Sequence, residues 1–299
     1  MEPQAQRPLR GILWMLITGL LFVAVTAVVK LIGDRIPAPQ AAFLRYLLGV
    51  VFLVPMLPIM RQTAIDRSTL ILFGGRGLVH GLGVIAWFYA MTQIPIAEVT
   101  ALNYAAPVYA TIGAALFLGE RLAARRIAAI GVAFLGALVI LRPGLREIEL
   151  GHIAMLGAGL AFAGSYLTAK ILSGRVPPLV VVGWLSLLVP VVMAPFALAV
   201  WVPPTLSELA WLFLVAALAT AGHYTMTVAF REAPLTVTQP VTFLQLVWAT
   251  SLGVVFFAEP LDAYVVLGGA MILAAVSFIT WREAVLKRRA TPGVVETKV

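Results

Sequence analysis

The sequence predicts an all-helical integral membrane protein whose ten transmembrane helices form two inverted repeats of five. Three observations lead to this prediction. First, 62% of the residues are hydrophobic and 11% are charged, with a mean hydropathy of +1.01, whereas soluble proteins carry about one quarter charged residues. Second, the apolar residues form continuous runs long enough to cross a bilayer. Third, the second half of the chain repeats the pattern of the first.

Proline, glycine and charged residues divide the apolar sequence into ten segments, each near the ~20 residues that a helix needs to cross the hydrocarbon core. The expected helices are 11–33, 38–60, 70–94, 96–118, 123–141, 151–173, 178–201, 209–230, 236–258 and 263–281. These runs lack the alternation of a membrane β-barrel, so we expect no strands. The resulting organisation is a cytoplasmic tail at 1–10, a first repeat at 11–142, a second repeat at 151–281 and a basic cytoplasmic tail at 282–299.

Lysine and arginine are distributed unevenly between the two sides of the predicted bundle. With the N-terminus in the cytoplasm, most of the 21 basic residues fall on the cytoplasmic side, as the positive-inside rule requires. Topology and attraction to anionic membrane lipid therefore explain the net charge of +8, and we do not expect nucleic-acid binding. The chain has no cysteine, which excludes disulfides, thiolate nucleophiles and cysteine-ligated metals.

Two blocks of sequence recur without gaps. Residues 11–37 match 151–177, with Lys30 opposite Lys170 and Arg35 opposite Arg175. Residues from Pro95 match those from Pro234, with Glu120 opposite Glu259. Because each copy contains five helices, an odd number, the second copy enters the membrane upside down. Inverted repeats of this kind are typical of secondary transporters, whose substrate sites lie near the bilayer midplane between the repeats.

Three stretches carry a family resemblance. "LGERLAARRIAAIGVAFLGALVIL" and "FAEPLDAYVVLGGAMILAAVSFI" each place a Glu at a helix end before a Gly-rich helix, and "FLRYLLG" surrounds Arg45. These stretches resemble the EamA branch of the drug/metabolite transporter superfamily, and within it the YddG-type amino-acid exporters. The resemblance implies an exporter of small metabolites in the bacterial inner membrane, not an enzyme. We expect a monomer with no cofactor and with both termini in the cytoplasm.

The stretch "GGRGLVHGLG", residues 74–83, places polar side chains deep in an apolar helix. His80 falls about 15 Å inside a helix entering near residue 70, at the centre of a ~30 Å core. Trp87 continues the same helix face, and Arg76 lies one turn before His80. We interpret His80, Trp87 and Arg76 as substrate-binding residues. The alternatives are a membrane-surface anchor for Arg76, a satisfied core position for His80 and an interfacial aromatic for Trp87.

Other segments contribute polar residues at comparable depth. The additional substrate-binding candidates are Asn103, Tyr104, His223, Thr227, Thr242 and Gln245. The hydroxyl groups could equally bond carbonyls of their own helix. We assign a structural or gating role to Pro107, Glu120, Glu259 and Arg45. The two glutamates are expected to mark helix ends rather than to bind substrate.

The acidic residues all lie in tails, loops or helix ends, so the sequence offers no buried carboxylate for a cation relay. No phosphate-binding loop is present. We therefore expect gradient-driven export by alternating access, with His80 or His223 carrying any coupled proton. A zwitterionic amino acid fits this site best, with its carboxylate on Arg76 and its ammonium on an aromatic ring. The alternatives are a drug or nucleotide-sugar exporter, a passive channel and an intramembrane enzyme.

Overall fold

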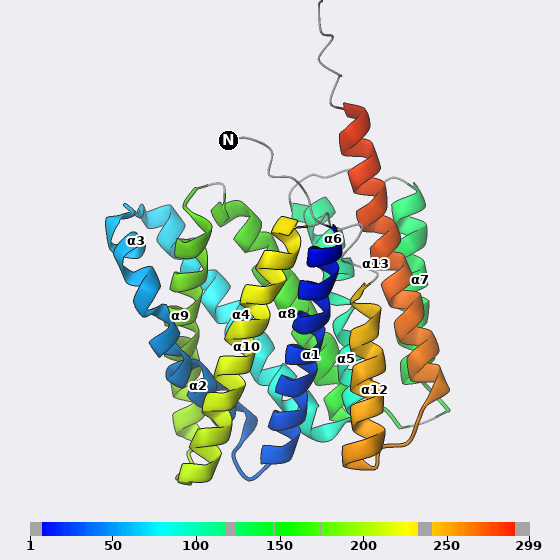
Figure 1. The fold of residues 1–299 in the computed structure, drawn as a ribbon, viewed down its shortest axis with the longest axis horizontal. Coiled ribbons are helices and arrows are strands. Elements are labelled where there is room, and N and C mark those ends of the chain that lie inside the picture. The colour runs from blue at the N-terminus through cyan, green and yellow to red at the C-terminus, as the bar shows by residue number, and fades with distance from the viewer. Residues whose placement is uncertain (1–7, 118–123, 146, 174, 233–240, 291–299) are drawn as a thin grey trace, which may run out of the picture.

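The computed structural model describes residues 8–117, 124–145, 147–173, 175–232 and 241–290, and over these ranges the chain is a bundle of α-helices without β-strands (Figure 1). The first repeat contains α1 (Pro8–Ile32), α2 (Ala38–Gly49), η1 (Val50–Met56), α3 (Leu57–Gln62), α4 (Arg67–Gln93), α5 (Ile96–Asn103), α6 (Ala106–Phe117) and α7 (Ala124–Leu141). The second contains α8 (Leu150–Ser173), α9 (Pro178–Ala199), α10 (Leu206–Glu232), α12 (Phe243–Phe257) and α13 (Ala263–Ala290).

The described residues include nine helical segments long and apolar enough to cross a membrane. The ninth predicted segment, 236–258, is represented by α12, and its first residues lie outside the described ranges. The helix predicted to end at residue 281 continues as α13 to Ala290. The prediction of an all-helical integral membrane fold is therefore confirmed.

Two predicted helices are interrupted by proline. The segment 38–60 contains a 3₁₀ stretch around Pro55, because proline cannot donate the backbone hydrogen bond of a continuous α-helix. The segment 96–118 breaks between α5 and α6, directly before Pro107. There the Tyr104 and Ala105 amides donate to carbonyls three residues earlier, in a tightened turn. The break places the carboxyl end of α5 inside the bundle.

The helices pair across the two repeats in an inverted, twofold pattern. α4 packs mainly against α8, and the corresponding helices α1 and α10 pack in the same way. α2 also packs against α9, and α7 against α13. The start of α1 and the end of α13 lie at one end of the bundle, the upper end in Figure 1. We call it the terminal end and the other the opposite end.

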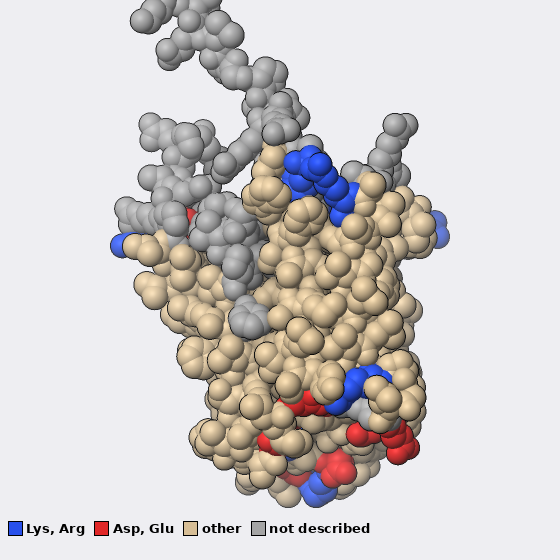
Figure 2. Space-filling model, turned by 90° about the vertical axis from the view of Figure 1, so that its right-hand side faces the viewer, with Lys and Arg blue, Asp and Glu red and all other residues tan. Residues whose placement is uncertain are grey.

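Small residues allow the closest crossing. A Cβ atom built on Gly136 of α7 would lie 2.7 Å from the carbonyl oxygen of Gly268 on α13, so the two backbones touch. Close packing of this kind drives helix association in lipid, because lipid tails are as apolar as the side chains and provide no hydrophobic driving force. The surface agrees with a membrane location, because charged residues gather at the two ends of the face in Figure 2 and an uncharged belt separates them.

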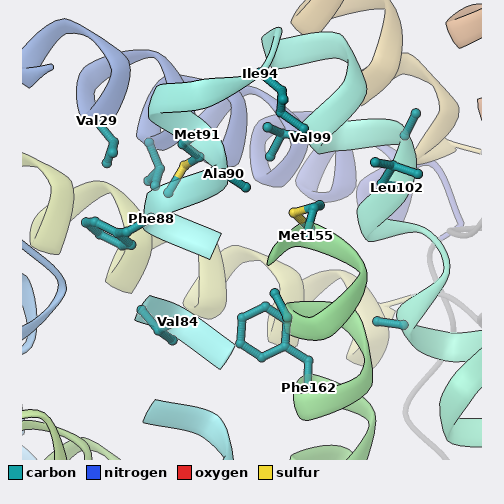
Figure 3. Close-up of a cluster of buried hydrophobic side chains, with 14 of the residues drawn as sticks. Val29, Val84, Phe88, Ala90, Met91, Ile94, Val99, Leu102, Met155 and Phe162 are labelled. Carbon is teal, nitrogen blue, oxygen red and sulfur yellow. The ribbon is translucent and has the colours of Figure 1, made fainter. Parts of the chain in front are cut away.

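The opposite end is filled by buried apolar side chains. Met91 of α4, Val99 and Leu102 of α5 and Met155 of α8 are at most 1% exposed and form part of one cluster (Figure 3). Helix α5 contacts α1, α4, α7, α8, α12 and α13. Helix α5 is thus the element against which helices of both repeats pack at this end of the bundle.

Candidate functional site

The candidate site begins with a polar cluster where α4 crosses α8. Ser165 of α8 is fully buried and joins two predicted residues: its Oγ lies 3.1 Å from His80 Nδ1 and accepts a hydrogen bond from Arg76 Nε at 3.3 Å. The other ring nitrogen of His80, Nε2, forms a 3.0 Å hydrogen bond with the Tyr46 hydroxyl. His80 is also the middle residue of α4. The cluster therefore lies at mid-depth, as predicted for a midplane site.

Glycine in α4 brings the two helices close enough for this cluster to form. A Cβ atom on Gly83 would lie 3.0 Å from Ala161 and 3.1 Å from the Phe162 ring, tighter than ordinary packing. Ser165 stands one helical turn beyond Ala161 on the same face of α8 and therefore reaches His80. The glycine-rich sequence of residues 74–83 thus allows α4 to lie close to α8.

Arg76 is buried, with 8% of its surface exposed, and its Nη1 donates to the carbonyl of Val181 on α9 at 3.0 Å. The side chain therefore ties α4 to α8 and α9, an arrangement that neither sequence interpretation of Arg76 included. Arg45 of α2 is also buried, and its guanidinium carbon lies 4.4 Å from the centre of the Tyr46 ring. Arg45 and Arg76 both act electrostatically on His80. The cluster is therefore basic.

Aromatic rings border the basic cluster. The Phe162 ring lies 5.2 Å from the His80 ring and 6.3 Å from the Trp87 ring, measured between centroids. His223 of α10 packs edge-on against Phe22 of α1, with ring centroids 5.2 Å apart. His80, Trp87 and Arg76 thus belong to one region, and His223 belongs to the α1–α10 crossing.

The two interrupted helices meet at a second polar contact. The Tyr104 hydroxyl, at the end of α5, donates to the carbonyl of Thr242 before α12 at 2.8 Å. Asn103 and Gln245 are half-buried near this contact in sequence, but no hydrogen bond between them is described. Pro107 is exposed at the start of α6. The side chain of Thr227 and the whole of Glu120 lie outside the described residues.

Glu259 lies at the opposite end, where it joins the repeats. Its carboxylate accepts the backbone N–H of Ile96 at 3.0 Å and forms an ion pair with Lys30. Lys30 also donates to the carbonyl of Ile94 at 3.2 Å. Glu259 therefore caps the first turn of α5 from the other repeat, in line with the predicted structural position at a helix end.

One carboxylate that the sequence places at a helix end, that of Glu98, is nevertheless buried. Glu98, in the first turn of α5, is 3% exposed, and its Oε2 lies 2.6 Å from Nε2 of the fully buried His152. Sequence position alone suggested a solvated helix end. Burial arises because α8 and α13 cover this turn of α5, which only the packing reveals.

Sequence reasoning also missed Tyr46, Phe162 and Ser165. Phe162 could have been found, because it is the repeat counterpart of Phe22. Tyr46 follows Arg45 directly, but nothing in the sequence directs it toward His80. The described residues contain no group of three metal-ligating side chains. Chemically, the region offers guanidinium, imidazole and hydroxyl groups beside aromatic faces, which suits non-covalent binding of a ring-containing molecule.

The EamA-like transporter family model matches residues 9–142 and again 149–281, which agrees with the duplication seen in the sequence. A riboflavin transporter of Rhizobium johnstonii is 32% identical, over 97% of this chain and 96% of that protein. An S-adenosylmethionine uptake transporter of Rickettsia prowazekii is 26% identical, over 92% of this chain and 94% of its own length. The pseudopaline exporter CntI of Pseudomonas aeruginosa is 26% identical, over 89% of this chain and 94% of that protein.

A protein of known crystal structure shares the fold, with a TM-score of 0.59 at 20% identity over 93% of this chain and 98% of the other. The relatives named above are transporters and not enzymes, and none is named as an amino-acid exporter of the YddG type. The expected resemblance is thus supported at the level of the family. This chain belongs to the EamA-like transporter family and is a multi-pass membrane transporter of a small molecule.

Proposed function

We propose that this transporter carries a planar, ring-containing metabolite of the flavin class, with riboflavin as the leading substrate. The observation behind the proposal is the basic cluster of Arg76, His80 and Ser165 beside the Phe162 and Trp87 rings. A flavin ring has two flat faces that stack on aromatic side chains, and oxygen and nitrogen acceptors at its edge that take hydrogen bonds from guanidinium and imidazole donors.

The charge of the region favours a neutral or anionic substrate. Among the described residues, the acidic side chains lie at helix ends and in connections, so the cluster around His80 has no carboxylate to take a substrate ammonium. The similarity to a riboflavin transporter over nearly the full length of both chains supports the same class. Binding takes place between the repeats, and alternate opening of the two ends moves the substrate.

Aromatic amino acids are the second candidate. The structure describes no acidic residue bonded to Arg76, so its guanidinium is available to a substrate carboxylate. The ammonium would then rest on an aromatic face, a cation–π contact that contributes up to about 2 kcal/mol when desolvated. This candidate requires the same residues and differs only in the substrate.

We further propose that the terminal end faces the cytoplasm of a bacterial inner membrane, because basic residues concentrate there. We also propose that a single copy is the transporting unit, because the cluster joins residues of both repeats of one chain. The relatives include both importers and exporters by name. The direction of net transport is therefore set by the substrate gradient in this proposal.

The experiment is exchange of labelled riboflavin in proteoliposomes, with unlabelled riboflavin, tryptophan and leucine as competitors. Riboflavin exchange that tryptophan and leucine do not inhibit supports the flavin class, and failure of riboflavin to exchange overturns it. Phe162→Ala should lower exchange at least about tenfold, because the variant removes the stacking face next to His80. Phe256→Ala, on a side chain that is 77% exposed, is the matched control and should leave exchange unchanged.

A further inference from the structure

Glu98 and His152 form a buried acid–base pair that the proposed binding region does not use. The carboxylate comes from the first turn of α5 and the imidazole from the first turn of α8, so the pair joins the two repeats. The side chains are 4% and 0% exposed, respectively. The pair lies at the opposite end of the bundle, where Glu98 directly precedes Val99 of the apolar cluster.

The hydrogen bonds define where protons reside on this pair. The backbone N–H of Glu149 donates to Nδ1 of His152 at 3.1 Å, so Nδ1 acts as an acceptor and carries no proton. The ring proton is therefore on Nε2 and donates to the Glu98 carboxylate at 2.6 Å. The closed end thus contains a neutral imidazole beside an ionised carboxylate.

A further proton is incompatible with this arrangement at either position. A proton on Nδ1 of His152 displaces the Glu149 N–H, and a proton on Glu98 removes the charge that strengthens the bond from Nε2. Once water reaches the pair, an imidazole is free to bind a proton near neutral pH. Because the open arrangement binds protons that the closed one excludes, acidification shifts the equilibrium toward the open arrangement.

The same turn of α5 is held by a second contact between the repeats. Glu259 accepts the backbone N–H of Ile96, two positions before Glu98, and forms an ion pair with Lys30. Release of His152 therefore removes a polar attachment that fixes α5 over this end, whereas the contact between Glu259 and the Ile96 amide contains no imidazole.

The other ionisable groups at this end come from each element packed against α5 or α8. They are Lys30, Asp34 and Arg35 of α1 and its following connection, Tyr89 of α4, Arg142, Glu147 and Glu149 after α7, Glu259 after α12, and Asp262 and Tyr264 at the start of α13. Lys30 is paired with Glu259, Arg142 with Asp262, and Arg35 with Glu208 of α10. His152 is the only histidine among these described residues.

We propose that the Glu98–His152 pair is a proton-binding site, and that proton uptake from the opposite side releases α5 and opens that end of the transporter. The inference rests on the proposed alternating access but not on the identity of the substrate. The ligand is a proton, and its effect is on the fraction of molecules in which this end is open.

The absence of cysteine makes the opening directly measurable. Val99→Cys places one thiol in the buried cluster of α5, where a water-soluble maleimide reaches it only when the opposite end opens. Glu147→Cys, on an exposed connection residue, is the reference that corrects for the pH dependence of the thiol itself. The reporter should react about tenfold faster, relative to the reference, at about pH 5.5 than at about pH 7.5.

His152→Gln in the Val99→Cys background should abolish this relative acceleration, since an amide cannot bind the proton. Glu98→Gln, which retains the shape of the side chain, provides a second variant should the first fail to fold. Acceleration that persists in a folded variant overturns the proposal, as does a reporter that is indifferent to pH in the parent chain. Riboflavin exchange in the same liposomes tests the substrate separately, because its failure removes the flavin assignment and leaves the labelling result interpretable.

Discussion

The α4–α8 crossing and the α1–α10 crossing are equivalent by the internal repeat, yet they differ in polarity. At the α4–α8 crossing, a Cβ atom built on Gly83 would lie 3.1 Å from the Phe162 ring. At the α1–α10 crossing, a Cβ atom built on Gly222 would lie 3.3 Å from the Phe22 ring. Each Phe is thus packed over a glycine of the opposite repeat. The backbone frame has been retained in both copies.

The polar residues on this frame have diverged. The α4–α8 crossing has Arg76, His80 and Ser165 in one hydrogen-bonded group. The α1–α10 crossing has a buried hydrogen bond of 2.8 Å between Thr18 and Thr225. Duplication thus produced two equivalent helix crossings, but only the α4–α8 crossing has the Arg76 guanidinium in its hydrogen-bonded group. The proposed binding site is therefore asymmetric within a symmetric scaffold.

The largest expected difference concerns the two histidines. His80→Ala removes hydrogen bonds to Ser165 and Tyr46, and at about 1 kcal/mol each we expect riboflavin exchange to fall by roughly tenfold to thirtyfold. His223 belongs to the α1–α10 crossing, outside this hydrogen-bonded group, so His223→Ala should lower exchange less than His80→Ala. Exchange rates in proteoliposomes at equal protein loading measure both. Equal losses in the two variants would show that polarity is shared between the crossings.

The second prediction compares the glycines. Gly83→Ala should destabilise the protein by about 1–2 kcal/mol, because overpacking against Ala161 and Phe162 exceeds the gain in helix propensity. A Cβ atom at Gly222 would lie 3.3–3.4 Å from the Phe22 ring, so in Gly222→Ala the smaller cost of overpacking nearly cancels the gain in helix propensity. Thermal unfolding in detergent should show the Gly83 variant melting about 2–4 °C below the Gly222 variant. The reverse order would contradict the tighter α4–α8 contact.

The smallest effect is expected at the helix starts. Asp66 caps α4 by accepting the Thr69 amide at 3.2 Å and the Ser68 hydroxyl at 2.7 Å, and the hydrogen bonds from Thr69 and Ser68 lower the pKa of Asp66 to about 2. The equivalent start of α10 is capped by Thr205 and Glu208, whose side chains accept each other's backbone amides.

Because the folded-state pKa of Asp66 lies below its usual value, the cap stabilises the protein fully above about pH 4 and is lost as the pH falls toward 2. Asp66→Ala should therefore lower the melting temperature slightly at pH 7, and the difference from the parent should vanish near pH 2. Melting curves of the two proteins across this range provide the measurement. A difference that does not change with pH would exclude the carboxylate as the source of the stabilisation.

The sequence predicted the helices well because each span must satisfy its backbone hydrogen bonds internally, which requires a long apolar run. It also predicted His80 at mid-depth, with Arg76 one turn before it, since position along a helix converts directly to depth. It could not predict that Tyr46 and Ser165 complete the cluster, because those contacts depend on the separation and rotation of α2, α4 and α8. The prolines were visible in the sequence, but the break before Pro107, which ends α5 next to the buried Leu102, was not.

Composition and periodicity were enough to predict a membrane protein, its inverted duplication and its family, because both reflect adaptation of a chain to a bilayer. The burial of Glu98 against His152 and the capping of α5 by Glu259 across the repeats emerge only from helix packing. They do so because the free-energy cost of a charge depends on the residues that cover it. That covering comes from residues more than fifty positions away in the chain.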